Sequence, residues 1–111
     1  MAEQEGVGQV ESGGDLVEEV DVEATAGVGQ RRPRARRYRI RIDRERFVVE
    51  VPEMTGREIL QLAGRCPPEA WMLSQRFCGG KVVPVELDDV VDFRAPGVER
   101  FMTLPKDQTE G

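Results

Sequence analysis

All six aromatic side chains lie between residues 38 and 101, which limits the folded core to the last two thirds of the chain. Residues 1–30 contain eight acidic residues, no Lys or Arg, and six of the twelve glycines. Such a segment buries too little apolar surface to offset about 1–2 kcal/mol of backbone entropy per residue. We therefore expect residues 1–36 to form a disordered acidic arm ending in an Arg-rich junction, residues 37–104 to form the domain, and residues 105–111 to form a flexible C-terminal tail.

The start of the domain carries the pattern of a β-hairpin followed by a helix. Residues 38–42 alternate apolar and basic side chains with period two, as half-buried strands do, and residues 47–51 are β-branched and aromatic. Pro52 ends this pairing because it has no N–H to donate. Thr55 and Glu58 have the spacing of a capping box, which predicts a helix of two to three turns ending near Gly64.

The rest of the domain predicts three further strands, at residues 71–77, 81–85 and 98–104, with a helical turn near residues 88–91. Pro84 indicates an edge position for the middle strand of these three. A hairpin, a crossover helix and a returning strand predict an α+β domain, in which a mixed sheet of about five strands packs on one helix. This is the element order of the β-grasp, or ubiquitin-like, architecture.

The absence of histidine excludes several kinds of active site. It excludes Ser-His-Asp and Cys-His catalysis and any imidazole metal site. Cys66 and Cys78 have no neighbouring base to lower a thiol pKa, and the other two ligands of a zinc site are missing. No segment has the roughly 18 to 20 apolar residues of a membrane helix, and the acidic start lacks the basic region of an export signal. We expect a cytoplasmic protein that is not an enzyme and binds no metal or cofactor itself.

Four motifs stand out along the domain and its tail: T-G-R-E-I-L at residues 55–60, P-P-E at 67–69, V-D-F-R-A-P-G-V-E-R-F at 91–101 and T-L-P-K-D-Q-T-E-G at 103–111. Together they resemble the bacterial multi-ubiquitin domain family, over about residues 38–111. The resemblance implies a ubiquitin-like protein modifier encoded beside three kinds of partner: E1-like activating enzymes, E2-like conjugating enzymes and deubiquitinating-type peptidases. It also implies antiphage defence as the biological setting.

The same resemblance assigns the chemistry to Gly111. It implies that an E1-like enzyme adenylates the Gly111 carboxylate with ATP and Mg²⁺, and that an E2-like enzyme passes the acyl group to target proteins. Because glycine has no Cβ, its carboxylate can enter a narrow channel. Ubiquitin ends in Gly-Gly, whereas this chain ends in Glu110-Gly111, so we expect an activating enzyme built for ubiquitin to reject this tail. The expected recognition residues of the tail are Leu104, Pro105, Lys106, Asp107, Gln108, Thr109 and Glu110.

Two other functions are compatible with this fold. The first is a ubiquitin-like interaction or assembly module whose terminus is never activated. The second is a sulfur carrier with a terminal thiocarboxylate, and Glu110 counts against it because sulfur carriers usually end in Gly-Gly.

Two charged segments precede the domain. The Arg run at residues 31–37 could bind nucleic acid, but we favour pairing with the acidic arm because no aromatic residue except Tyr38 is available for base stacking. The arm also contains an aliphatic run set among acids, which resembles peptides that add a strand to ubiquitin-like domains. We hypothesise that this run binds another copy or a partner and drives assembly; a plain solubilising tail is the alternative. Its candidate residues are Leu16, Val17, Val20 and Val22.

Overall fold

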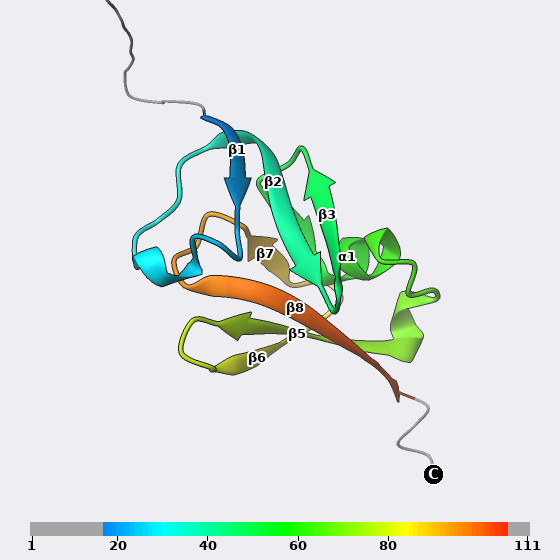
Figure 1. The fold of residues 1–111 in the computed structure, drawn as a ribbon. Coiled ribbons are helices and arrows are strands. Elements are labelled where there is room, and N and C mark those ends of the chain that lie inside the picture. The colour runs from blue at the N-terminus through cyan, green and yellow to red at the C-terminus, as the bar shows by residue number, and fades with distance from the viewer. Residues whose placement is uncertain (1–16, 107–111) are drawn as a thin grey trace, which may run out of the picture.

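The computed structural model describes residues 17–106, which form an α+β fold (Figure 1). The strands are β1 (Val17–Asp21), β2 (Ala35–Ile42), β3 (Glu45–Val49), β4 (Glu53–Thr55), β5 (Trp71–Phe77), β6 (Val82–Val85), β7 (Val90–Asp92) and β8 (Val98–Pro105). The helices are α1 (Gly56–Leu62) and two short 3-10 segments, η2 (Ala26–Val28) and η3 (Pro68–Ala70). The main sheet has the order β1-β2-β8-β5-β6, and β3 also pairs with β2. The prediction of a mixed sheet with one α-helix is confirmed for the described residues.

Strands β2 and β3 form the predicted hairpin. They are antiparallel, with Ile42 opposite Glu45, so Asp43 and Arg44 alone make the turn. Asp43 has a φ of 56°, in the left-handed region that Asp tolerates better than most side chains. The alternation in β2 places Tyr38, Ile40 and Ile42 in the core.

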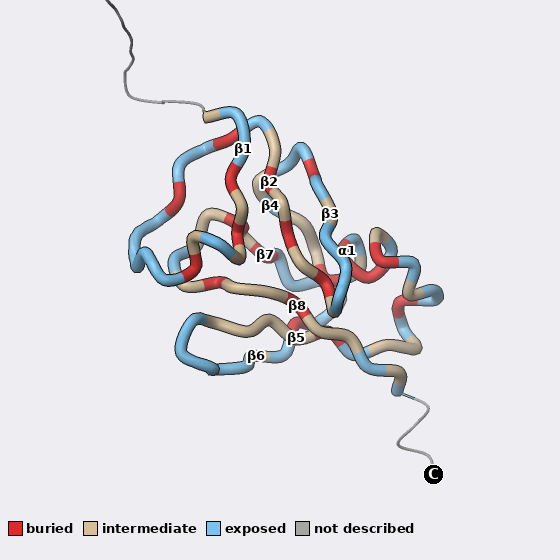
Figure 2. The backbone as a smooth tube through the Cα atoms, viewed as in Figure 1, coloured by how far each residue is buried: buried red, intermediate tan, exposed pale blue. Residues whose placement is uncertain are grey.

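Helix α1 supplies the other side of the core. Its N-terminus has the predicted capping box, in which Thr55 accepts from the Glu58 N–H and the Glu58 carboxylate accepts from the Thr55 N–H. Ile59 and Leu60 are buried in the same apolar cluster as the inner face of the sheet (Figure 2). Phe93 lies in this cluster, 6.1 Å from the Tyr38 ring and 6.1 Å from the Phe101 ring, measured between centroids.

One predicted element has a different structure. The helical turn expected near residues 88–91 is absent, and β7 occupies the end of that segment, antiparallel to β4 with Met54 opposite Val91. Val91 is buried between two more exposed neighbours, which is the pattern of a strand. Three-residue strands are too short for this alternation to be recognised in the sequence.

The folded domain begins well before residue 37, where we expected it to begin. β1 runs parallel to β2, from Val17 opposite Ala35 to Asp21 opposite Arg39. This corrects the expectation of disorder for residues 17–36. The composition of the arm is misleading because few of its side chains are buried, and the buried ones include Val20, Val22 and Ala26. Residues 1–16 lie outside the described residues.

Candidate functional site at the base of the tail

The C-terminal tail leaves the domain at the end of β8. Strand β5 pairs with β8 as far as its last residues, with Met72 opposite Leu104 and Trp71 opposite Pro105. Leu104 is 48% exposed and Met72 is 44% exposed, so this strand end presents an apolar pair to solvent. Lys106 is the last described residue. The predicted tail residues Asp107, Gln108, Thr109, Glu110 and Gly111 lie outside the described residues.

A polar cluster holds β8 just before the tail. The Asp43 carboxylate accepts hydrogen bonds from the main-chain N–H and the hydroxyl of Thr103. Nη2 of Arg65 donates to the same carboxylate at 3.0 Å, and its Nε donates to the Thr103 hydroxyl at 3.1 Å. The Asp43 N–H donates to the Phe101 carbonyl at 2.8 Å. The cluster therefore joins the β2–β3 turn, the segment after α1, and β8.

The charge of Asp43 is part of this arrangement. Burial alone would raise the pKa of the Asp43 carboxyl, but the hydrogen bonds from Thr103 and Arg65 outweigh burial and lower the pKa below its ordinary value. The group is thus a carboxylate at neutral pH and acts only as an acceptor. Because all its donors come from other segments, we infer that the cluster fixes the direction in which the chain leaves β8.

A cation–π contact at Trp71 and an ion pair lie near the same strand end. The Arg65 guanidinium lies 5.2 Å from the centre of the Trp71 ring, within cation–π range. Arg57 Nη1 donates to the Glu69 carboxylate at 2.8 Å. This hydrogen bond lowers the pKa of Glu69, and the positive charge of Lys106 contributes in the same direction. The tail thus begins beside fixed charges of both signs.

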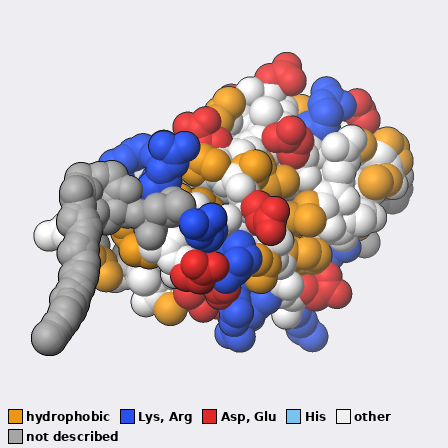
Figure 3. Space-filling view, turned by 90° about the horizontal axis from the view of Figure 1, so that it is seen from above, with side chains coloured by type: hydrophobic (Ala, Val, Ile, Leu, Met, Phe, Trp, Pro, Cys, Tyr) orange, Lys and Arg blue, Asp and Glu red, His pale blue; other side chains and the backbone are white. Residues whose placement is uncertain are grey.

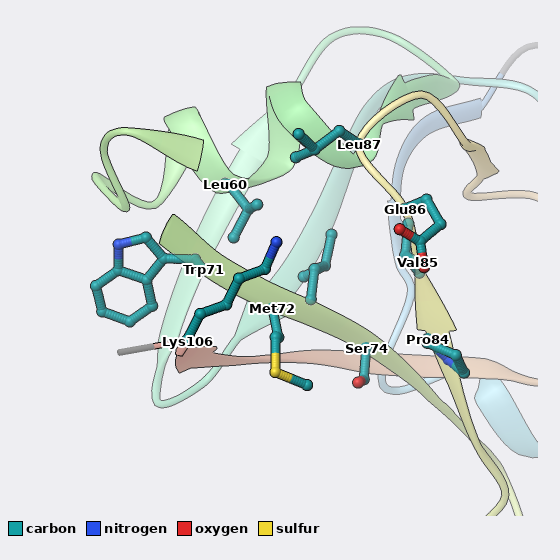
Figure 4. Close-up of a pocket in the computed structure, with 10 residues that line it drawn as sticks. Leu60, Trp71, Met72, Ser74, Pro84, Val85, Glu86, Leu87 and Lys106 are labelled. Carbon is teal, nitrogen blue, oxygen red and sulfur yellow. The ribbon is translucent and has the colours of Figure 1, made fainter. Parts of the chain in front are cut away.

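An open groove of about 520 Å³ lies between α1 and the β5–β6 pair, next to the start of the tail. Figure 4 shows Trp71 and Lys106 at one end and Pro84 with Glu86 at the other. Apolar and polar surface contribute about equally to its walls, so the groove offers both apolar and charged contacts but contains no pair of reactive groups. Its lining residues are Leu60, Trp71, Met72, Leu73, Ser74, Pro84, Val85, Glu86, Leu87 and Lys106.

The acidic and basic segments before the domain lie against each other. Arg36 and Arg37 pair with Glu18, and Arg37 and Arg39 pair with Glu19. Figure 3 shows basic and acidic side chains next to one another on the face seen from above. The pairing that we favoured for the Arg run is confirmed for these residues. Each exposed pair contributes only about 0–1 kcal/mol, so the pairs orient β1 more than they stabilise it.

The predicted strand-adding residues are found in a strand, but within their own chain. Val17 and Val20 belong to β1 and pair with β2, and Val22 follows with its N–H donating to the Arg39 carbonyl at 2.9 Å. Leu16 lies outside the described residues. Strand addition to a ubiquitin-like sheet is therefore seen here as an intramolecular contact.

Arg32 is another functional candidate that no sequence pattern indicates. It is 5% exposed, and burial lowers the pKa of its guanidinium. Nη2 donates to the carbonyls of Val22 and Val98, at 2.9 and 2.6 Å. The remaining guanidinium donors bind Thr25 Oγ1 and the carbonyls of Phe93 and Ala95. In the sequence it is one of five arginines in seven positions, and nothing distinguishes it from the exposed ones.

Neither cysteine lines the groove. Cys66 and Cys78 are exposed free thiols. Within residues 17–106, no group of three or more Cys, Asp and Glu side chains is placed to hold a metal ion. No helix in the same range is long and apolar enough to cross a membrane.

A comparison with models of known protein families identifies the family of this chain. The family model described as Multiubiquitin matches residues 38–106, which is more than half of the sequence. The chain belongs to the multiubiquitin family. The match confirms the resemblance found in the motifs at the level of a ubiquitin-like family. In this multiubiquitin protein, the matched region ends at the last described residue of the tail and begins within β2, so β1 and Arg32 lie upstream of it. No curated protein and no solved structure matches the chain.

Proposed function

We propose that this multiubiquitin protein is a β-grasp protein modifier whose Gly111 carboxylate is activated and transferred to other proteins. The observation that carries the proposal is the supported strand end: β8 is fixed through Thr103 by Asp43 and Arg65, and the next residue, Leu104, is exposed. A tail that starts from a rigid point can be presented to a partner while the domain is held elsewhere. Membership of a ubiquitin-like family supports the same interpretation.

The chemistry of this function requires little from the modifier itself. An oxygen of the Gly111 carboxylate attacks the α-phosphorus of ATP bound with Mg²⁺ by an E1-like enzyme, and pyrophosphate leaves. A thiolate of that enzyme then displaces AMP to form a thioester. An E2-like thiolate takes the acyl group, and an amine or hydroxyl of the target displaces that thiolate in the last step. ATP supplies the free energy and the partners supply the catalytic groups.

The residues of the modifier act through presentation and recognition. Leu104, Pro105 and Lys106 begin the expected recognition segment, and the exposed Leu104 side chain is available for contact. Asp107, Gln108, Thr109 and Glu110 complete it in the sequence. A deubiquitinating-type peptidase would reverse the modification by cleaving after Gly111. We place this cycle in the bacterial cytoplasm, with antiphage defence as its setting.

The test is formation of a thioester with an E1-like enzyme from the same host. Wild-type protein, ATP and Mg²⁺ are expected to give an enzyme adduct that survives denaturing electrophoresis and is cleaved by a reducing thiol. Gly111→Val keeps the carboxylate but adds a branched side chain on the α-carbon, next to the acyl carbon, and we expect it to reduce the adduct severely. Cys78→Ser, which alters an exposed thiol away from the tail, serves as the matched control and is expected to behave like wild type.

The outcomes separate the possible functions. An adduct that forms equally with Gly111→Val contradicts the acyl-donor role. Failure of wild-type protein to form any adduct, together with a single unmodified mass in the host, supports the non-conjugated module instead. Replacement of one terminal oxygen by sulfur, detected in the intact mass, supports the sulfur carrier.

A further inference from the structure

The first strand of the sheet lies outside the family domain. The multiubiquitin match begins at Tyr38, whereas β1 ends at Asp21 and is joined to β2 by residues 22–34. β1 nevertheless occupies one edge of β2 along residues 35–39, while β3 occupies the other edge. This chain therefore fills a strand position of the sheet with a segment that precedes the matched domain.

The chemistry of that position suits an acidic and aliphatic strand. Val20 and Val22 are 6% and 0% exposed and belong to the core cluster. Glu18 and Glu19 are exposed on the same strand and pair with arginines of β2. This edge of β2 therefore suits a strand with buried aliphatic side chains and exposed acidic ones. The same strand is present in a second copy of this chain.

Arg32, in the segment between β1 and β2, forms hydrogen bonds both with residues next to β1 and with the rest of the domain. On one side it binds Val22 and Thr25, which belong with β1. On the other side it binds Phe93, Ala95 and Val98, which belong to the domain. Residues 17–26, which we call the β1 arm, therefore pack as one unit against a surface that includes Arg32.

A short hinge connects this arm to the domain. Residues 27–31 are all exposed, and Val28 is 62% exposed. Gly29 has a φ of 81°, and a Cβ at this position would meet nothing within 4 Å. The chain reverses here because glycine permits a left-handed conformation, and packing does not hold the turn in place.

We propose that two copies of this protein exchange their β1 arms, so that each arm lies on β2 of the other copy and residues 27–30 become the extended hinge. The arm keeps its parallel pairing, its two buried valines and its contacts with Arg32 in the exchanged form. Only the hinge conformation and the entropy of association differ between the two forms, which is why such exchange is a low-cost route to a dimer. The partner of this surface is a second copy of the chain.

The test is a disulfide between two different chains. One full-length chain carries Glu19→Cys, the other carries Arg37→Cys with a mass tag, and both have Cys66→Ser and Cys78→Ser. Glu19 and Arg37 are Cα partners across the β1–β2 pair, a spacing that a disulfide can span. After incubation together at high concentration and oxidation, we expect a disulfide-linked heterodimer.

The control chain carries Val82→Cys in place of Arg37→Cys, since Val82 is exposed on β6, away from β1. We expect at least tenfold less heterodimer from this pair. Equal yields with the two chains, or no heterodimer with Arg37→Cys, would overturn the proposal.

A pair of glycine variants tests the hinge separately. Gly29→Val disfavours the left-handed turn and is expected to strengthen dimerisation by about tenfold, measured by sedimentation. Gly79→Val places the same strain at a φ of 101° in the β5–β6 turn and is expected to leave dimerisation as strong as in wild type. An equal shift in both variants would contradict a hinge at residues 27–30.

Discussion

The replacement of Arg32 by Met is the most informative perturbation of the fold, because it removes a buried cation while keeping a long apolar stem. Arg32 donates five side-chain hydrogen bonds, four of them to main-chain carbonyls of Val22, Phe93, Ala95 and Val98. A hydrogen bond to a charged group contributes about 1.5–3 kcal/mol, and an unpaired buried acceptor costs about 1–3 kcal/mol. Relief of guanidinium desolvation offsets part of this loss, because burying a charge costs several kcal/mol.

We therefore expect Arg32→Met to lower the free energy of unfolding by about 3 kcal/mol, which is about 12–24 °C in Tm for a domain of this size. Urea unfolding followed by Trp71 fluorescence measures the free energy, and amide exchange at Val22 reports whether β1 is released. Arg34→Met is the matched control, because Arg34 is exposed in the same arginine run, and we expect a change within about 0.5 kcal/mol. Equal stability of the two variants would refute the role of Arg32 in joining β1 to the domain.

Two further substitutions test the tail base and the start of α1. Asp43→Asn keeps the left-handed turn but removes the charge, and we expect a loss of about 1–2 kcal/mol at pH 7 by urea unfolding. The folded pKa of Asp43 lies below its unfolded value, so the stability that its carboxylate contributes is present above about pH 5. The difference in stability between Asp43→Asn and wild type therefore shrinks as the pH falls through the folded pKa. A difference that does not change with pH would contradict this. Gly56→Ala improves helix propensity but places a Cβ against the Glu86 carbonyl oxygen, so we expect it to lower the free energy of unfolding by about 1–3 kcal/mol. Gln61→Ala, at an exposed position of the same helix, is the control and is expected to leave stability unchanged. A Gly56→Ala protein as stable as wild type would show that this approach is not as close as the structure places it.

The elements that could be predicted from the sequence are those whose pattern lies within one short segment of the chain. The alternation of residues 38–42 is repeated in the burial of Tyr38, Ile40 and Ile42, because a strand with one buried face needs that period. The capping box at Thr55 and Glu58 is a contact between residues three apart, so it is visible without the rest of the fold. Pro84 is found in the edge strand β6, as its missing N–H requires.

The features that the sequence did not predict depend on contacts between distant segments. Asp43 and Thr103 are 60 positions apart, and Arg65 reaches both from the end of the helical segment. Each is an ordinary polar residue in a turn, a connecting segment or a strand, so nothing in the neighbouring sequence indicates that the three meet at the start of the tail. β1 was missed for the same reason: its acidic composition indicates a solvated segment until the arginines of β2 and the buried Arg32 are placed beside it.

The attachment of Gly111 to other proteins is tested most directly by the remnant that it would leave. Trypsin cleaves after Lys106, so a modified acceptor would carry the five residues Asp-Gln-Thr-Glu-Gly on its side chain. Mass spectrometry of host proteins, after purification of the tagged chain under denaturing conditions, is predicted to find this remnant joined through the Gly111 carbonyl to an amine or hydroxyl. Recovery of residues 107–111 only as a free peptide, in cells where the tagged chain is abundant, would contradict the proposed function.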